Sequence, residues 1–283
     1  MILSICIPSY NRVEILVNQL DRLIPFVEKN NLIEIVVSDN CSTDDTTNVI
    51  KLKYGNKIIV NKNSENIGIV NNIKKLYELS KGKYIWFLGD DDLINIDSLE
   101  KLINILINCD LNMIYLNHNI SKILKNTTSS KNFIDEKNDK LFKKGEELLI
   151  LVMKIKITQL MLISAIIYKK ELLKKIIYEN TNIASPLSYP LKTCRNPGDY
   201  YYYSNNTFTN YQGQVSWESE SLNVFTKYVP FIIIKSLFYE YGWKYNIIAF
   251  KYFFEYKTVI FNYYSGLNKI KKIIKFIKNG KNK

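Results

Sequence analysis

In the first 116 residues, short runs of apolar residues alternate with segments whose apolar residues recur every three or four positions. The short runs predict strands at 2–7, 33–38, 57–60, 84–89 and 111–116, and the recurring pattern predicts helices at 13–23, 45–54, 69–79 and from 98 onward. Strands that are apolar at every position are buried on both faces, as in a mostly parallel sheet covered by helices. The pattern therefore predicts an α/β fold.

The regular alternation stops after residue 116. Residues 117–144 are polar and rich in Asn, Lys and Ser, which predicts a surface excursion, and a strand is expected at 160–168 between helices at 144–154 and 170–178. From residue 221 onward, aromatic residues and lysines are mixed in helical patterns. We therefore expect two halves of one domain, 1–116 and 117–220, and a helical C-terminal region, 221–283, that is a candidate for membrane association.

Bulk composition narrows the class of protein. A hydrophobic content of 47% is typical of a folded globular chain. The four cysteines, Cys6, Cys41, Cys109 and Cys194, form no CxxC pair, which fits a reduced cytosolic protein and gives no zinc motif. No basic leader with an apolar segment is evident, and no stretch reaches the ~20 apolar residues of a membrane span. A cytoplasmic location is expected.

A formal charge of +12 calls for an anionic partner: nucleic acid, a membrane surface or a phosphorylated substrate. Residues 267–283 carry seven lysines and no acid, and isoleucines at 270, 273, 274 and 277 share one helical face. This predicts a C-terminal helix that contacts anionic lipid peripherally at the inner face of the cytoplasmic membrane. The alternative is an ordinary surface helix packed on the domain. Nucleic acid is not expected, because the positive charge lies in the tail while the sheet edge is acidic.

Three adjacent aspartates, Asp90, Asp91 and Asp92, directly follow the apolar run that predicts the fourth strand. Adjacent carboxylates repel one another unless positive charge lies among them. A divalent cation with oxygen ligands, whose shell is completed by phosphates, is one solution. A solvated turn is the other.

Each of four polar turns follows the carboxyl end of a predicted strand. They span 8–12, 38–46, 63–68 and 89–92. In open parallel sheets, ligands bind beyond these ends. Tyr10 could stack on a nucleobase while a carboxylate such as Asp39 pairs with its edge, and diphosphate oxygens could use the cation. No GxGxxG or P-loop motif is present.

Four ordered segments, 4–12, 34–46, 66–68 and 82–92, resemble the family 2 glycosyltransferases, which have the GT-A fold. The resemblance covers roughly the first 116 residues. It implies a Rossmann-like, mostly parallel sheet flanked by helices. It also implies a nucleotide-diphospho-sugar donor, with UDP expected, an Mn²⁺ or Mg²⁺ ion, and transfer with inversion at the anomeric carbon.

The same resemblance implies a set of residue roles. Pro8, Tyr10 and Arg12 would surround the nucleoside, and Asp39 would read the uracil. The turn from Asn66 to Gly68 would line the nucleotide pocket. The triplet Asp90, Asp91 and Asp92 would hold the ribose and the metal, with Asp90 and Asp91 binding the donor and Asp92, then Asp91, expected to contact the ion. The commoner family pattern is Leu-Asp-x-Asp-Asp, and Gly89 replaces its first aspartate, which leaves open which carboxylate binds the ion.

The general base that deprotonates the acceptor hydroxyl is expected in the second half of the chain. Asp199 is the only acid between Thr181 and Tyr203, so we predict it as the base, against the alternative that it belongs to a Pro-Gly-Asp turn. His118, the single histidine, is predicted to be structural.

The predicted function is thus a hexosyltransferase-type reaction onto a hydroxyl of a glycan or lipid-linked saccharide. Together with the basic tail, it suggests bacterial capsule or lipooligosaccharide synthesis. A sugar-phosphate nucleotidyltransferase would carry a glycine- and lysine-rich phosphate loop near its start, and none is visible. A basic nucleic-acid- or membrane-binding protein without catalysis is the third alternative.

Overall fold

The computed structural model describes residues 1–124, 127–179, 182–212, 221–236, 241 and 246–257. By its internal contacts the chain divides into two units, Met1–Val215 and Ser216–Lys283. Each unit is described by itself.

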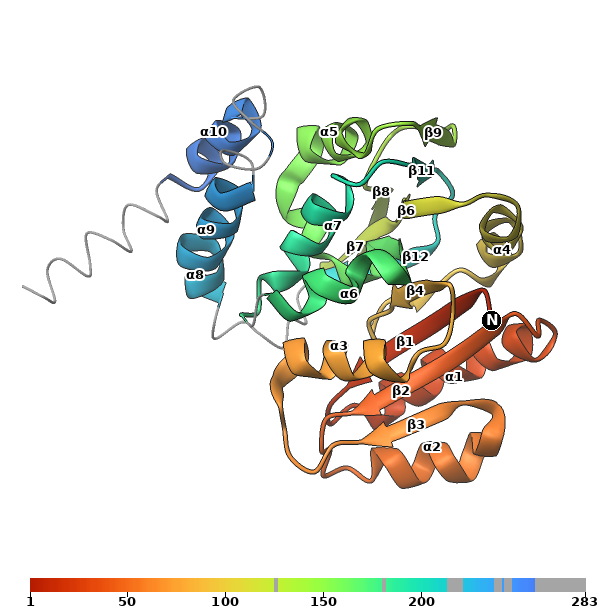
Figure 1. Ribbon diagram of the computed structural model, residues 1–283. Coiled ribbons are helices and arrows are strands. Elements are labelled where there is room, and N and C mark those ends of the chain that lie inside the picture. Colours follow the sequence, from red (N-terminus) through yellow and green to blue (C-terminus); the bar gives the residue numbers. More distant parts are fainter. Residues whose placement is uncertain (125–126, 180–181, 213–220, 237–240, 242–245, 258–283) are drawn as a thin grey trace, which may run out of the picture. The chain divides into compact units, whose positions relative to one another are not determined.

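The first unit is built on a twisted central sheet with the strand order β3-β2-β1-β4-β10-β6-β11-β9 (Figure 1). Most neighbours are parallel, whereas β10 runs antiparallel to β4 and β6, and β9 runs antiparallel to β11. The strands are β1 (Leu3–Ser9), β2 (Ile33–Asp39), β3 (Ile59–Lys62), β4 (Tyr84–Phe87), β6 (Leu111–Leu116), β9 (Lys140–Phe142), β10 (Ile166–Lys169) and β11 (Asp199–Tyr203). The predicted mostly parallel α/β sheet is confirmed.

Helices connect these strands and cover the sheet. One pair, α1 and α2, is in contact, and so is a second pair, α3 and α6, while α3 also packs on β1 and β2 (Figure 1). The helices are α1 (Val13–Glu28), α2 (Thr46–Tyr54), α3 (Gly68–Leu79), α4 (Leu99–Asn108), α5 (Gly145–Lys156), α6 (Lys170–Glu179) and α7 (Ser188–Thr193). Every residue of β1, β2, β4 and β6 is buried, as expected for strands covered on both faces.

The chain order reverses at β1. It proceeds from β1 to β2 and β3 on one side, and then crosses to β4 on the other side of β1. Such a reversal is a topological switch point, where ligands of open α/β sheets bind beyond the carboxyl ends of the strands. The polar turns after β1 and β4 therefore lie where a ligand is expected.

A second, four-stranded sheet has the order β5-β12-β7-β8. Its strands are β5 (Leu93–Ile94), β12 (Phe208–Gln212), β7 (Asn119–Leu124) and β8 (Thr127–Asn132). The sequence-based prediction missed the three strands of the segment 117–144, while the expected place at the surface fits residues 135–144, all of which are exposed or partly exposed. The polar residues of this segment lack the alternation of a half-buried strand, so pairing between strands, which the local pattern does not reveal, determines the structure.

The strand expected at 160–168 was also partly wrong. Only its end enters the sheet, as β10, and two short 3₁₀ turns, Ile157–Met161 and Ile163–Ala165, precede it. Apolar runs of this length do not distinguish a buried turn from a strand.

In the second unit, a helical stretch is formed by α8 (Ser221–Asn223), a π-helical turn (Val224–Tyr228) and α9 (Val229–Ile233), and α10 spans Asn246–Glu255. The Tyr252 hydroxyl of α10 donates a hydrogen bond of 2.8 Å to the carbonyl of Phe225. The predicted amphipathic helix at 267–283 lies outside the described residues. Within the described part of the chain, no helix is both long enough and apolar enough to cross a membrane.

The single histidine follows β6 and is fully buried between two aromatic rings. Phe133 and Phe208 stack on His118 with centroid distances of 5.2 and 4.9 Å. Burial lowers the pKa of His118 to about 4. In the unfolded chain, a histidine has its ordinary pKa of about 6.5. Between pH 6.5 and 4, the imidazole is therefore protonated in the unfolded state but neutral in the native state.

We expect the free energy of unfolding to fall as the pH drops from about 6.5 to about 4, by roughly 3 kcal/mol from this residue alone. Urea denaturation at a series of pH values measures this loss. His118→Phe keeps the stacking but has no titrating group, so its unfolding free energy should fall less over the same range. Parallel curves for the two proteins would contradict the prediction.

Candidate active site

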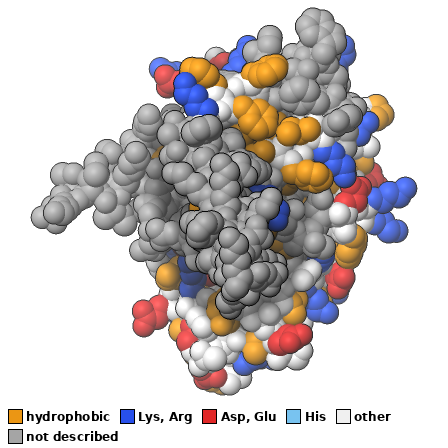
Figure 2. Space-filling view, turned by 90° about the vertical axis from the view of Figure 1, so that its left-hand side faces the viewer, with side chains coloured by type: hydrophobic (Ala, Val, Ile, Leu, Met, Phe, Trp, Pro, Cys, Tyr) orange, Lys and Arg blue, Asp and Glu red, His pale blue; other side chains and the backbone are white. Residues whose placement is uncertain are grey.

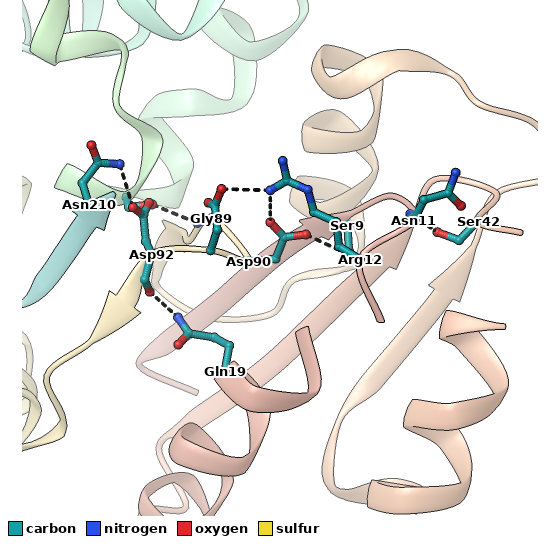
Figure 3. A network of polar contacts seen from close by, with 11 residues as sticks. Ser9, Asn11, Arg12, Gln19, Ser42, Gly89, Asp90, Asp92 and Asn210 are labelled. Carbon is teal, nitrogen blue, oxygen red and sulfur yellow. Dashed lines mark hydrogen bonds and ion pairs between the residues drawn. The ribbon is translucent and has the colours of Figure 1, made fainter. Parts of the chain in front are cut away.

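The aspartate triplet and the turn after β1 meet at the switch point (Figure 3). One terminal nitrogen of Arg12 lies 3.0 Å from a carboxylate oxygen of Asp90 and 2.9 Å from one of Asp91. The Ser9 hydroxyl, at the end of β1, donates to the other oxygen of Asp90 at 3.0 Å. A cation from the first turn thus offsets the repulsion between two adjacent carboxylates.

Asp90 is almost completely enclosed, with 7% of the residue exposed. Burial raises the pKa of Asp90 to about 6, although the guanidinium of Arg12 acts in the opposite direction. The two carboxylate oxygens already have partners in Ser9 and Arg12. We interpret Asp90 as part of the wall of the site.

Asp92 is also enclosed, with 3% of the residue exposed, and burial raises its pKa to about 6. One carboxylate oxygen accepts a hydrogen bond from the Ser164 hydroxyl. The other accepts one from the Asn210 amide at 2.8 Å (Figure 3). Its main-chain carbonyl accepts from Gln19 of α1 at 2.7 Å. Each carboxylate oxygen of Asp92, the leading candidate for a metal ligand, thus already has one protein donor, and a metal bound there would share the oxygens with Ser164 and Asn210.

Asp91 is the most open of the three. A third of its side chain is exposed, and it borders a pocket of about 210 Å³ with Asp90, Leu93 and the α1 residues Ile15, Asn18 and Gln19. Its carboxylate therefore has room for a further ligand beside the Arg12 contact.

The donor atoms fit a metal that shares its shell with a substrate. Among the residues that the structure describes, no three acidic, histidine or cysteine side chains form a set that could hold a metal ion. Mg²⁺ is commonly held by one or two carboxylates, with water and substrate phosphates completing the octahedron. Asp91, beside Asp90, offers that kind of partial shell.

The first two turns are held together by hydrogen bonds. Asn11, which has a φ of 52°, donates its main-chain N–H to the Ser42 hydroxyl at 2.8 Å and accepts the N–H of Thr43 on its side-chain oxygen at 2.8 Å. Asp44 accepts the N–H of Val13 at 3.0 Å. Beside these contacts Pro8 is buried in β1, and Tyr10 is 43% exposed. The ring of Tyr10 is therefore available for stacking.

Asp39, at the end of β2, is fully buried. Its oxygens accept the main-chain N–H of Ser42 at 2.9 Å and the hydroxyl of Thr47 at 2.5 Å. In this structure Asp39 therefore shapes the second turn. A base that paired with it would compete with those two donors.

The third turn is held by amide side chains. The side-chain oxygen of Asn66 accepts the N–H of Gly68 at 3.0 Å and the amide of Asn40 at 2.7 Å. Gly68 has a φ of 76°, a conformation that glycine adopts without strain. Asn63 bridges Asn40 and Asn72, at 3.1 and 3.0 Å. The sequence indicated the turn, but not the asparagine network beneath it.

Asp199 does not lie at this edge. It is the first residue of β11, in register with Leu111 at the start of the parallel strand β6, and it forms an ion pair with Lys143 at 2.8 Å. The triplet follows the carboxyl end of β4, whose direction β6 and β11 share. The assignment of Asp199 as general base was therefore wrong, because the direction of its strand places it at the opposite edge of the sheet.

Gln19, Ser164 and Asn210 contact the triplet and were not predicted. Ser164 is an isolated polar residue in an apolar run, whereas Gln19 and Asn210 each stand beside another polar residue in a mixed segment, and no motif marks any of the three. One signal in the sequence pointed to Gln19. It lies on the face of the predicted first helix that carries the buried apolar residues, where a polar side chain is unusual.

These features define a class of protein: a doubly wound α/β domain with an arginine and three aspartates at its switch point. A family model, Glycosyl transferase family 2, matches residues 4–176. The chain belongs to this family.

Curated relatives match the amino-terminal part of the chain. Abequosyltransferase RfbV of Salmonella typhimurium is 44% identical over 103 residues, covering 35% of this chain and 31% of its own length. The UDP-Glc:alpha-D-GlcNAc-diphosphoundecaprenol beta-1,3-glucosyltransferase WfaP of Escherichia coli is 33% identical over 91 residues, covering 32% of this chain and 36% of its own length. The matches thus span about a third of these relatives.

Solved structures share the fold. S. aureus TarS 1-349 in complex with UDP-GlcNAc gives a TM-score of 0.63 at 18% identity, covering 83% of this chain and 67% of that one. The mannosyltransferase PcManGT from Pyrobaculum calidifontis, in complex with GDP-Man and Mn²⁺, gives 0.54 at 13% identity, covering 80% and 61%. These matches extend the fold similarity well beyond the segment shared with the curated relatives.

The contact of Arg12 with two carboxylates leads to a prediction. We expect Arg12→Ala to lower the free energy of unfolding by about 2 kcal/mol, because Asp90 would keep a buried charge without its cation or would have to take up a proton. Urea denaturation at neutral pH measures the change. Arg12→Lys, which keeps the charge, should lose less, and equal losses in both variants would contradict the electrostatic explanation.

Proposed function

We propose that this protein transfers a sugar from a nucleotide-diphospho-sugar to a hydroxyl of a glycan or lipid-linked acceptor, with inversion and with UDP as the nucleotide. The observation that carries the proposal is the meeting of Arg12, Asp90 and Asp91 at the switch point. Membership of glycosyl transferase family 2 supports the reaction class. The UDP-GlcNAc in the TarS complex and the UDP-Glc in the name of WfaP support the donor class.

Within this proposal, Asp91 takes the metal contact that was first assigned to Asp92. Asp91 is the open carboxylate, whereas the oxygens of Asp92 are occupied by Ser164 and Asn210. A divalent ion held there would supply positive charge to the diphosphate leaving group. The Mn²⁺ in the PcManGT complex supports a metal for this fold.

The other residues of the first half bind and orient the donor. Tyr10 stacks on the nucleobase, and the turn at Asn66 and Gly68 forms the pocket wall beside it. Arg12 places a positive charge against the carboxylates of Asp90 and Asp91 and holds both side chains in position before the donor arrives. Asp39 contributes through the shape of the second turn. With Asp199 excluded, the proposal names no general base.

The acceptor side of the proposal rests on the C-terminal region. The lysine-rich segment 267–283, whose sequence predicts an amphipathic helix and which lies outside the described residues, would contact anionic lipid at the inner face of the cytoplasmic membrane. Exposed rings of α10, Phe250 at 63% and Phe254 at 69%, suit an interface, and Lys257 lies 4.1 Å from the ring centre of Phe254. Figure 2 shows hydrophobic side chains beside basic ones on the surface toward the viewer. This supports a role in the synthesis of a surface glycan such as capsule or lipooligosaccharide.

Thermal unfolding with UDP, in the presence and absence of Mn²⁺, tests the donor site. At a hundred times the dissociation constant, UDP with Mn²⁺ should raise the melting temperature by about 5 °C, and more than UDP alone does. Asp91→Asn should lose the part that depends on Mn²⁺. The matched control Asp199→Asn, at the opposite edge of the sheet, should keep it. Equal shifts with and without metal in the wild-type protein would overturn the metal-dependent site.

Sedimentation with lipid vesicles tests the membrane contact. A chain that ends at residue 266 should bind vesicles containing phosphatidylglycerol at least tenfold more weakly than the full chain, because each lysine near an anionic surface contributes about 1 kcal/mol. The full chain should bind vesicles of phosphatidylcholine alone more weakly than vesicles that contain phosphatidylglycerol. Equal binding by the two chains would exclude the tail as the anchor.

A further inference from the structure

The residues that follow the triplet form an edge of the second sheet. In the antiparallel pair of β5 and β12, Ile94 lies opposite Phe208 and Leu93 lies opposite Thr209. One step further in the same register, Asp92 is opposite Asn210, and the amide of Asn210 donates to the Asp92 carboxylate at 2.8 Å. The contact between Asp92 and Asn210 is thus a continuation of strand pairing.

A second contact comes from the 3₁₀ turn before β10. The Ser164 hydroxyl accepts the N–H of Gly89 at 2.8 Å and donates to the second oxygen of Asp92. The carbonyl of Ser164 accepts the indole N–H of Trp86 in β4 at 2.8 Å, and Ser164 is fully buried. The two ends of the turn Gly89–Asp92 are therefore fastened to one side chain from the second half of the domain.

The turn is tightly packed at its first residue. A Cβ on Gly89 would lie 2.8 Å from a carboxylate oxygen of Asp92, so a larger residue at 89 would push the Asp92 carboxylate away. Glycine in place of the family's usual aspartate therefore leaves room for the Asp92 carboxylate to reach Ser164 and Asn210. Asp91, between the two fastened ends, is left to point toward Arg12 and the pocket.

We propose that Ser164 and Asn210 are positioning residues, and that Asp92 is the anchor through which they fix the direction of Asp91. On this proposal, Asp92 contacts neither donor nor metal. Outer residues that orient a metal ligand typically change metal affinity by 10- to 100-fold when they are removed. The proposal rests on the proposed donor site, and it adds that residues of the acceptor half set the geometry of that site.

A reciprocal exchange tests the proposal. Asn210→Asp alone places a second carboxylate against that of Asp92. Asp92→Asn alone places a side-chain amide against the amide of Asn210 and replaces one of the two acceptor oxygens at position 92 by an NH₂ group. In the double variant, the amide introduced at position 92 can donate to the carboxylate introduced at position 210 and still accept from Ser164, so the hydrogen bonds return with donor and acceptor reversed. Asn104→Asp, on the exposed face of α4, controls for added charge.

Two measurements are made on each full-length protein: the melting temperature without ligand, and the affinity for UDP with Mn²⁺ by calorimetry. Each single variant should bind UDP with Mn²⁺ at least about tenfold more weakly and melt earlier, while the double variant recovers most of both losses. If Asp92 were a metal ligand, the double variant would recover its melting temperature but not its affinity. That result, or a double variant that recovers neither, would overturn the proposal.

Ser164→Ala gives a second test that does not depend on the exchange. It should weaken binding of UDP with Mn²⁺ by about tenfold and change binding of UDP without metal by less than about twofold. Equal losses with and without Mn²⁺ would mean that Ser164 supports the fold only. If the wild-type protein bound no UDP with Mn²⁺, the donor assignment would fail, while recovery of the melting temperature in the double variant would still support Asp92 as the anchor of the turn.

Discussion

Three consecutive carboxylates at the end of a buried strand repel one another, and the fold relieves this repulsion by turning the three side chains toward different partners. Asp90 turns to the arginine and serine of the first turn, Asp91 toward the same arginine and the pocket, and Asp92 into the second sheet. The partners come from the turn after β1, from the 3₁₀ turn before β10 and from β12. The positions of β1, β10 and β12 around β4 are therefore conditions for the triplet to exist in this form.

Local pattern was sufficient for much of the donor half. The strands 33–38 and 111–116 could be predicted because most of their residues are apolar, and the parallel sheet then brings their carboxyl ends together. This is why Arg12 and Asp90, 78 residues apart, could be expected to meet. The turn at Asn66 and Gly68 was visible for the same reason.

Sequence reasoning failed where the answer depends on strand direction or register. Asp199 was chosen because it is an acid in the expected region, but β11 begins with it, so it lies at the wrong end of the sheet. Asn210 reaches the triplet only through the pairing of β12 with β5, two strands separated by more than a hundred residues. Ser164 lies in a short 3₁₀ turn, but the apolar residues around it predicted a strand there. Strand direction and strand pairing join residues that are far apart in the chain, so no short segment of sequence reveals them.

The pairing of Asp92 with Asn210 also bears on how the molecule is made. During synthesis, the first four strands and their helices leave the ribosome long before β12 does, and domains commonly begin to fold in that order. The aspartate turn, however, cannot reach its final form until residue 210 has emerged, because until then Asp92 lacks one of its two side-chain donors. Nascent chains should therefore pass through a stage in which the nucleotide half is assembled but its acidic tip is still unsettled.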